Sequence, residues 1–236
     1  MPRVVRTPRP NKRPPARIFY GVSTKQRVIA LTFDDGPDPT WTPQVLSILQ
    51  KKRVAATFFM VGQMVRAHPR FARQVQAAKF PIGSHSWSHP RHPRSPKAEI
   101  ERTDAIMQRV LGFKPTLFRP PYGIMNNGLV KVALSRDQNV IIWDSFGADW
   151  DKHATSATIA AKVLKSARPG GIVLLHDGGG HRAKTVAALP HIIDTLRKRG
   201  FRFVTVPRIL SMGPPIAVPV ASAARLKHFK NSKTAG

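Results

Sequence analysis

Residues Val28–Pro37 read VIALTFDDGP, and this stretch decides the fold. Its apolar half is typical of a buried strand, and the Gly36-Pro37 turn places Asp34 and Asp35 at the point where the strand ends. Two adjacent carboxylates at the edge of a sheet can divide their work, since one can bind a metal ion while the other moves a proton. The pair is therefore our first candidate for the centre of a functional site.

The composition makes this acidic pair conspicuous, because the chain is strongly basic. It has 236 residues, with 39 Lys and Arg against 12 Asp and Glu, and a formal net charge of +27. The length suits one domain with a full core, and a hydrophobic content of 42% argues against global disorder. Cysteine is absent, which excludes disulfides and thiolate ligands. No apolar run approaches the ~20 residues of a membrane span, so we expect no transmembrane segment.

The positive charge predicts attraction to polyanions such as nucleic acid, anionic lipid or an acidic cell-wall polymer. Ordinary solvated helix faces are the alternative explanation. The sequence contains no helix-turn-helix, zinc-finger or RNA-binding motif, and few aromatic residues interrupt its basic tails. We therefore expect no specific nucleic-acid partner, although a basic nucleic-acid-binding protein without catalysis stays open as an alternative of another class.

We expect three parts along the chain. Residues 1–19 are basic and rich in proline, and they lack the apolar stretch of a signal peptide. Residues 20–212 form the expected folded domain. Residues 213–236 are a second basic extension, and we expect both extensions to be mobile.

Strand-like and helix-like segments alternate within the folded part. The strand candidates are short apolar runs: Val28–Phe33, Val54–Val61, Pro81–Ser84, Thr116–Arg119, Val140–Trp143, Ile172–Leu175 and Phe201–Val206. Apolar residues at helical spacing predict helices between them: about Thr42–Lys52, Gln63–Ala78, Ser95–Leu111, Leu129–Ala133, Ala157–Ala167 and Ala183–Lys198. This alternation predicts a parallel sheet covered by helices, and seven strands suit an α/β barrel better than an open sheet. Because polar motifs follow the strand candidates, we expect a site at the C-terminal rim of the strands.

Two histidines, His85 and His89, are separated by three residues in the sequence HSWSH. On a helical turn, residues i and i+4 face the same side, so the two imidazoles could bind one ion. One carboxylate from Asp34 or Asp35 would complete a His₂Asp site. Three protein ligands leave positions open for water, which is typical of a catalytic zinc site. Two surface histidines near a basic loop are the alternative.

Three further motifs follow strand candidates. The rigid loop Arg119–Gly123 carries one cation, which could hold a carboxylate ionised, and it could aim a backbone N–H at a developing oxyanion. Asp149 lies beside Trp150, whose ring could contact the face of a sugar. His176 ends the strongest strand next to an acid and is a candidate general acid. We expect no role for the remaining histidines, which are His68, His92, His153, His181, His191 and His228.

In this order, the motifs TFDDGP, HSWSH, RPPY, DW and LLHD resemble the five motifs of the polysaccharide deacetylases, carbohydrate esterase family 4. The resemblance covers about Arg27 to Pro207. It implies an irregular (β/α)7-type barrel with the active site at the C-terminal rim of the strands. It also implies metal-dependent removal of N-acetyl groups from polymers of β-1,4-linked N-acetylglucosamine (GlcNAc), with residues 20–212 as the catalytic domain.

The resemblance implies a metal site and a base. Asp35, His85 and His89 would bind Zn²⁺, or another divalent ion such as Co²⁺, Ni²⁺ or Mn²⁺. The ion would lower the pKa of its bound water toward ~7. Asp34 would take a proton as this water attacks the acetamide carbonyl.

The resemblance also implies roles around this centre. Arg119 would tether Asp34, and the backbone N–H of Tyr122 would help to stabilise the oxyanion. His176 would protonate the departing amine as the general acid, and Asp149 would tune it. The acetyl pocket would be lined by Trp150 and Leu174.

Two positions depart from the family pattern. The fourth motif usually has an acid three residues before the Asp-Trp pair, but here that residue is Phe146, and Asp144 lies two residues earlier. Ser84 precedes His85 where the family often has Asn. These changes predict a different loop geometry and different contacts around the metal ligands.

Peptidoglycan is the substrate that the basic surface favours, because bacterial walls carry anionic polymers that could also be partners of this surface. A chitin or chitooligosaccharide deacetylase and an acetyl xylan esterase stay open. A catalytically inactive carbohydrate-binding relative is less favoured, since every proposed catalytic side chain is present. We expect a monomer that acts outside the cytoplasm, in the cell wall or secreted, although no signal peptide is visible.

Overall fold

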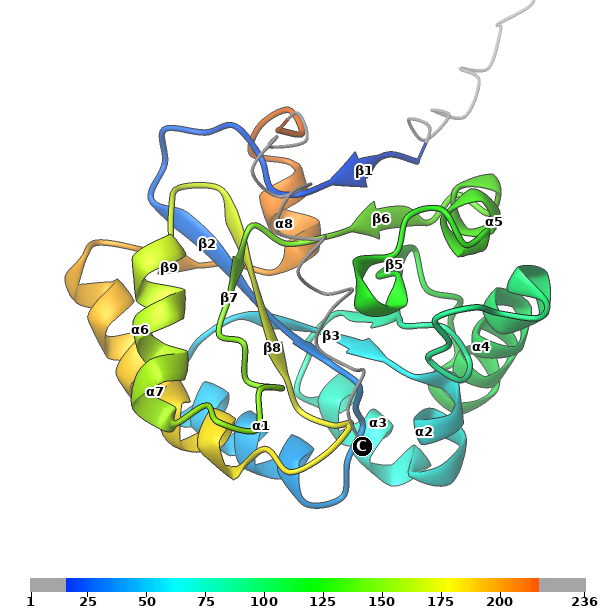
Figure 1. Ribbon diagram of the computed structural model, residues 1–236, viewed down its shortest axis with the longest axis horizontal. Helices are drawn as coiled ribbons and strands as arrows, with labels where there is room; N and C mark the ends of the chain where they lie inside the picture. The colour runs from blue at the N-terminus through cyan, green and yellow to red at the C-terminus, as the bar shows by residue number, and fades with distance from the viewer. Residues whose placement is uncertain (1–15, 217–236) are drawn as a thin grey trace, which may run out of the picture.

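The structure is a computed structural model that describes residues 16–216. Its strands form one sheet in which every pairing between strands is parallel. The sheet curls without closing, in the order β1-β6-β5-β4-β3-β2-β8-β7, with β9 paired to β2 (Figure 1). The strands are β1 (Ile18–Phe19), β2 (Val28–Asp34), β3 (Ala56–Met60), β4 (Ile82–Ser84), β5 (Leu117–Phe118), β6 (Asn139–Ile141), β7 (Ser145–Phe146), β8 (Gly171–His176) and β9 (Arg202–Phe203). The predicted α/β fold of the (β/α)7 type is confirmed.

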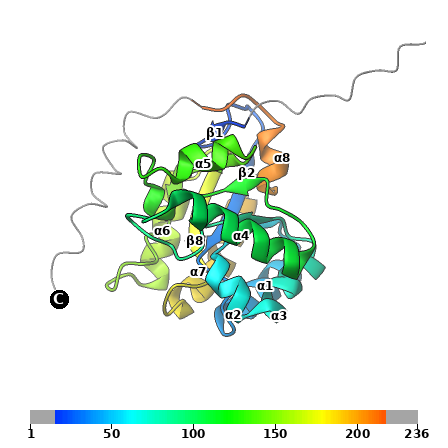
Figure 2. The ribbon, with the colours of Figure 1, turned by 90° about the vertical axis from the view of Figure 1, so that its right-hand side faces the viewer.

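Helices cover the outside of the curled sheet (Figure 1). Figure 2 shows α4 packed between α5 above it and α2 and α3 below it. The helices are α1 (Trp41–Lys51), α2 (Gly62–Ala67), α3 (Pro69–Ala77), α4 (Pro96–Leu111), the short 3₁₀ helix η1 (Pro121–Gly123), α5 (Leu129–Ser135), α6 (Ser156–Ser166), α7 (Ala183–Lys198) and α8 (Val206–Leu210). None of the described helices is long and apolar enough to cross a membrane.

All residues of β2 are buried, which shows that this strand lies at the centre of the fold. Its side chains alternate between two apolar clusters: Ile29, Leu31 and Phe33 pack towards α1 and α7, whereas Val28 and Ala30 pack inside the curl of the sheet. A strand with apolar residues on both faces is typical of a parallel sheet covered by helices. This explains why the VIALTF run predicted the fold.

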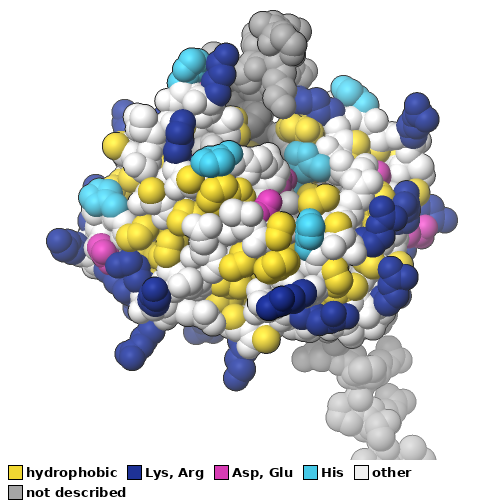
Figure 3. Space-filling view, turned by 90° about the horizontal axis from the view of Figure 1, so that it is seen from below, with side chains coloured by type: hydrophobic (Ala, Val, Ile, Leu, Met, Phe, Trp, Pro, Cys, Tyr) yellow, Lys and Arg dark blue, Asp and Glu magenta, His cyan; other side chains and the backbone are white. Residues whose placement is uncertain are grey.

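The register of β2 and β8 brings two distant motifs together. Thr32 is paired with Leu174, and Asp34 is paired with His176. In Figure 1 both strands run towards the lower edge of the molecule, so the view from below in Figure 3 looks onto their carboxyl ends. The sheet therefore places the Asp34 and His176 motifs side by side at one rim.

Several predicted elements were wrong in their bounds. The single helix expected over Gln63–Ala78 is two helices, because His68 precedes a proline and has non-helical φ and ψ of −129° and 53°. The last strand covers only Arg202–Phe203, since Thr205 caps a helix that was not predicted, α8. The two-residue strands β1 and β7 were also missed, because they are too short to show a periodicity.

The described residues extend beyond both predicted boundaries of the folded domain. Strand β1 pairs with β6, and the backbone N–H of Ser23 donates to the carbonyl oxygen of Pro214 at 2.9 Å. Most of the two basic extensions, residues 1–15 and 217–236, lies outside the described residues. The division into three parts stays a prediction.

Candidate active site

All predicted site residues except the buried Arg119 line one cavity of about 620 Å³ at the C-terminal rim of the strands. Figure 3 shows a hollow near the middle of this face, with acidic and histidine side chains around it. The predicted residues that line the cavity are Asp34, Asp35, His85, His89, Tyr122, Asp149, Trp150, Leu174 and His176. The convergence expected from the strand ends is therefore observed.

Asp34 is held in place by a fully buried arginine. Arg119 Nη1 donates to Asp34 Oδ1 at 2.7 Å and to Thr32 Oγ1 at 2.7 Å. The other guanidinium nitrogens donate to the carbonyl oxygens of Ile141 and Ile142 at 3.1 and 3.2 Å. These contacts fix one oxygen of Asp34 and leave Oδ2 facing His85 Nε2 at 3.6 Å. The Arg119 guanidinium therefore orients the Asp34 carboxylate.

Asp35, His85 and His89, which we call the ligand cluster, could hold a metal ion. One potential ligand atom from each residue lies within 4.8 Å of the others. Asp35 Oδ1 lies 3.4 Å from His85 Nε2 and 3.3 Å from His89 Nε2. Burial lowers the pKa of His89 to about 4, and the neighbouring His85 adds to this shift, which favours the neutral imidazole that metals bind.

The hydrogen bonds of the ligand cluster are compatible with a cation at this place. His85 Nδ1 lies 2.8 Å from the carbonyl oxygen of Arg119, so this nitrogen must donate its proton. In the neutral ring, Nε2 is then an acceptor that faces another acceptor, Asp35 Oδ1. That oxygen is buried and has no aligned hydrogen-bond donor among the described residues. Acceptors that converge without a proton between them fit a divalent cation.

The two histidines lie in a loop that follows β4. Residues 85–89 form this loop, in which φ is 66° at Ser86 and 56° at His89. It is a tight loop rather than a helical turn, although an i, i+4 spacing is compatible with both. The loop still brings the two imidazole rings together, with their centroids 4.8 Å apart.

His176 and Asp149, which we call the imidazole–carboxylate pair, lie on the other side of β2. Asp149 Oδ1 accepts from His176 Nδ1 at 2.8 Å, and Oδ2 accepts from the backbone N–H of His176 at 2.9 Å and from Thr185 Oγ1 at 2.8 Å. Burial lowers the pKa of His176, but the charge and hydrogen bond of Asp149 outweigh burial and raise this pKa to about 9. The pair therefore favours a protonated imidazole, which can act as a general acid.

Two residues that support this pair were not predicted. Thr185 donates to Asp149 as described, and Arg182 is buried beside it. Arg182 donates to the carbonyl oxygens of Asp149, Gly178 and Gly179 at 3.0, 2.7 and 3.1 Å. The only sequence signal for Arg182 was its place two positions after a glycine run, which is too common to single out.

Tyr122, Trp150 and Leu174 form the apolar part of the cavity. Tyr122 has φ of 57° and ψ of 11°, a left-handed conformation that is strained for a bulky residue and that recurs at functional sites. Its ring lies 4.5 Å from the ring of His89 and 4.1 Å below the guanidinium of Arg91.

The two departures from the family pattern have structural consequences. Phe146 stacks on Trp150 with ring centroids 5.7 Å apart, so an aromatic contact stands where the family usually has an acid. Asp144 is remote from this contact, because it accepts from the backbone N–H of Ile172 at 2.7 Å and pairs with Arg168. Ser84 Oγ is buried without a hydrogen-bond partner among the described residues.

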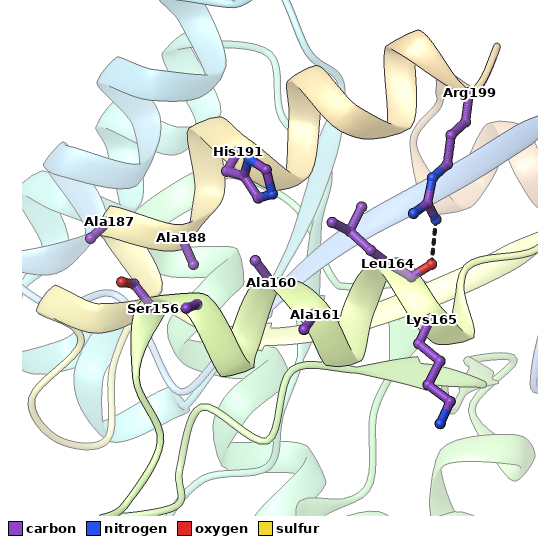
Figure 4. A pocket seen from close by; sticks show the side chains of 10 residues that line it. Ser156, Ala160, Ala161, Leu164, Lys165, Ala187, Ala188, His191 and Arg199 are labelled. Atoms are coloured by element: carbon purple, nitrogen blue, oxygen red, sulfur yellow. Dashed lines mark hydrogen bonds between the residues drawn. The ribbon is translucent and has the colours of Figure 1, made fainter.

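A second hollow, of about 610 Å³, lies between α6 and α7 (Figure 4). Its labelled side chains are mostly small, and the labelled imidazole, His191, has no acidic side chain among the residues drawn. None of the predicted catalytic, ligand or substrate residues lies there. The chemistry of the described residues is therefore concentrated at the strand ends.

Comparisons with known proteins agree with this geometry. The family model for polysaccharide deacetylase matches residues 21–140. A peptidoglycan-N-acetylglucosamine deacetylase of Bacillus cereus is 39% identical over 203 residues, which cover 84% of this chain and 94% of the relative. A chitooligosaccharide deacetylase of Bradyrhizobium is 33% identical and covers 80% of this chain and 94% of the relative. The crystal structure of a peptidoglycan N-acetylglucosamine deacetylase, Bc1960, matches with a TM-score of 0.78 and 32% identity over 85% of this chain and 95% of that chain.

The chain belongs to the polysaccharide deacetylase family. The resemblance of its five motifs to this family is thus confirmed. The relatives named above are hydrolases that act on peptidoglycan or chitooligosaccharides, which supports the prediction of a deacetylase over that of a nucleic-acid-binding protein.

Proposed function

We propose that this protein is a metal-dependent deacetylase that removes N-acetyl groups from the GlcNAc units of peptidoglycan. One observation carries the proposal: the ligand cluster, in which acceptors converge without a proton, lies in the same cavity as a histidine that is stabilised in its protonated form. Amide hydrolysis needs both an electrophilic centre and a proton donor for the amine.

Asp35, His85 and His89 would hold the ion, which we propose to be Zn²⁺, with Co²⁺, Ni²⁺ or Mn²⁺ as substitutes. When bound, the ion would polarise the acetamide and make water a stronger nucleophile near neutral pH. Asp34 would accept a proton through Oδ2, because Arg119 occupies its other oxygen.

The remaining residues act on the acetamide group. The backbone N–H of Tyr122 would stabilise the negative charge that develops on the carbonyl oxygen. His176 would transfer a proton to the amine as the C–N bond breaks, and Asp149 would keep the ring oriented. Trp150 and Leu174 would pack around the acetyl methyl group. The products are acetate and a glucosamine unit.

The rim of the cavity favours peptidoglycan over neutral chitooligosaccharides. Arg91, Lys152 and Lys184 line the rim, and the ion pairs of residues 16–216 leave all three without a carboxylate partner. One exposed acid, Asp151, lies among them. Peptidoglycan carries carboxylates on its peptides and on muramic acid units that bear no peptide, so cations without a carboxylate partner at the rim fit it better. This substrate places the site of action outside the cytoplasm.

An acetate-release assay on peptidoglycan fragments and on chitooligosaccharides, each with and without a chelator, tests the proposal. We expect acetate from peptidoglycan fragments, loss of activity with chelator, and recovery with Zn²⁺.

Arg91→Gln should lower kcat/KM for the charged fragments about two- to fivefold and leave the neutral substrate unchanged, since exposed ion pairs contribute up to about 1 kcal/mol. Lys198→Gln, which removes a charge from the end of α7, is the control. Salt-dependent DNA binding without acetate release from any glycan would overturn the proposal.

A further inference from the structure

A single carboxylate holds the loop that carries the two histidines. Glu99 Oε2 accepts from the backbone N–H groups of Trp87 and Ser88 at 2.9 and 2.8 Å, and Oε1 accepts from Ser88 Oγ at 2.7 Å. Hydrogen bonds to an ionised acceptor are stronger than those between neutral groups. Both oxygens of Glu99 are therefore engaged with the tip of the loop between His85 and His89.

Glu99 is itself fixed by its place in α4. It lies in the first turn of the helix, where the positive end of the helix dipole stabilises a carboxylate. Ser95 caps this turn by accepting from the backbone N–H of Ala98 at 3.2 Å, and Thr103 Oγ1 donates to the carbonyl oxygen of Glu99 at 2.8 Å. The helix thus supplies a rigid anchor for the loop.

The two histidines depend on this anchor to different degrees. The ring of His85 has its own support, because Nδ1 contacts the carbonyl oxygen of Arg119. For the ring of His89, the described residues supply ring packing against His85 and Tyr122 and the approach to Asp35, and its backbone N–H donates to Ser86 Oγ at 3.1 Å. The position of His89 is therefore set mainly by the conformation of the loop.

The side chain of Trp87 adds to the anchor. Its ring is 5% exposed, and the guanidinium groups of Arg66 and Arg102 lie 5.1 and 4.1 Å from it. A Cβ atom at Gly62 would lie 2.7 Å from this ring, so α2 also packs closely against the loop. The segment is thus held in two ways: Arg66 and Arg102 lie against the Trp87 ring, and Glu99 binds the backbone.

We infer that Glu99 is a positioning residue for the metal site, and that it sets the metal affinity by holding His89 in place. The inference rests on the proposed metal site. Contacts that orient metal ligands typically contribute 10- to 100-fold in metal affinity. Glu99→Ala removes all three hydrogen bonds, whereas Gln could keep them, because its carbonyl oxygen could accept from both backbone N–H groups and its NH₂ group could donate to Ser88 Oγ.

The test compares Glu99→Ala with Glu101→Ala in the full chain. Glu101 lies on the same helix but pairs with Arg136 and Lys97 at 3.3 and 4.0 Å, so its substitution removes the same charge without touching the loop. Competition with a chromophoric chelator at fixed pH gives the Zn²⁺ dissociation constant. We expect binding about 10- to 100-fold weaker for Glu99→Ala and a change of less than about twofold for Glu101→Ala.

The melting temperature of the metal-free protein separates positioning from support of the fold. A lower melting temperature with unchanged Zn²⁺ affinity would overturn the inference. If Glu99→Ala does not fold, Ser88→Ala removes only the hydroxyl contact, and we expect Zn²⁺ binding weakened by about two- to tenfold; wild-type affinity would overturn the inference. If the wild-type chain itself binds no divalent ion, the proposed function fails, which is a distinct outcome.

Discussion

The ligand cluster and the imidazole–carboxylate pair lie in one cavity, but the polar atoms of the two groups have different surroundings. In the pair, the two oxygens of Asp149 accept three hydrogen bonds, all from within the protein. In the cluster, Asp35 Oδ1 is buried, has no aligned donor among the described residues, and faces a nitrogen that is an acceptor in the neutral ring. The pair is complete in the protein alone, whereas the converging acceptors of the cluster fit a divalent cation.

This difference predicts that substitutions in the two groups have separable effects. A change in the cluster should alter metal binding first, and activity as a result. A change in the pair should alter proton transfer and leave the metal bound. The four predictions below test this separation, from the largest expected effect to the smallest.

His85→Ala should abolish Zn²⁺ binding and activity together. It removes an inward-facing nitrogen, and we expect a loss of affinity greater than the roughly 100-fold typical of residues that only orient a ligand. Metal content after dialysis and acetate release measure the two effects. His191→Ala, in the hollow between α6 and α7, is the matched control. Tight stoichiometric Zn²⁺ in the His85 variant would remove this residue from the ligand set.

His176→Ala should keep the metal and lose turnover. General acid catalysis typically contributes 10²- to 10⁴-fold, so we expect kcat to fall by ~10²-fold or more at unchanged Zn²⁺ content. Both quantities can be measured on the same preparation. A rate close to that of the wild type would exclude His176 as the proton donor, and loss of metal would break the separation between the two groups.

Asp149→Asn should move the alkaline limit of activity to lower pH. His176 acts as an acid only while it is protonated, and the Asp149 carboxylate outweighs burial to raise its pKa to about 9. With a neutral amide in this place, burial dominates and the pKa falls, so activity is lost at a lower pH as the pH rises. A profile of kcat/KM against pH measures the shift. An unchanged alkaline limb would mean that a different group sets it.

The local sequence was sufficient to predict the positions of the site residues that lie at the ends of strands. The VIALTF run is buried on both faces, so its pattern predicted both the strand and the position of Asp34 at its end. The same held for His176 at the end of β8. The detailed geometry of the loop at residues 85–89 could not be predicted, because left-handed φ values at Ser86 and His89 have no signature at this spacing.

The supporting residues could not be predicted, because they act across distances that the sequence does not encode locally. Thr185 lies 36 positions from Asp149, and Glu99 lies 11 positions from Ser88. Each is near the start of a helix, where Thr and Glu are common for reasons of local structure. Their contacts depend on how α4 and α7 pack against the loops, which only the complete fold determines.

Thr185→Val should have the smallest effect, and this effect should be confined to the imidazole–carboxylate pair. Thr185 is 1% exposed, and Val nearly matches its shape while removing the hydroxyl that donates to Asp149 Oδ2. Asp149 keeps its contacts with the ring and the backbone N–H of His176, so the pair should remain assembled. We expect a decrease of about 1.5–3 kcal/mol in the free energy of unfolding, as for a hydrogen bond to a charged group. Urea unfolding followed by tryptophan fluorescence measures this change, and Zn²⁺ affinity should stay within about twofold of the wild type. Weaker Zn²⁺ binding would show that the pair and the cluster are coupled, because the altered hydroxyl contacts only the pair.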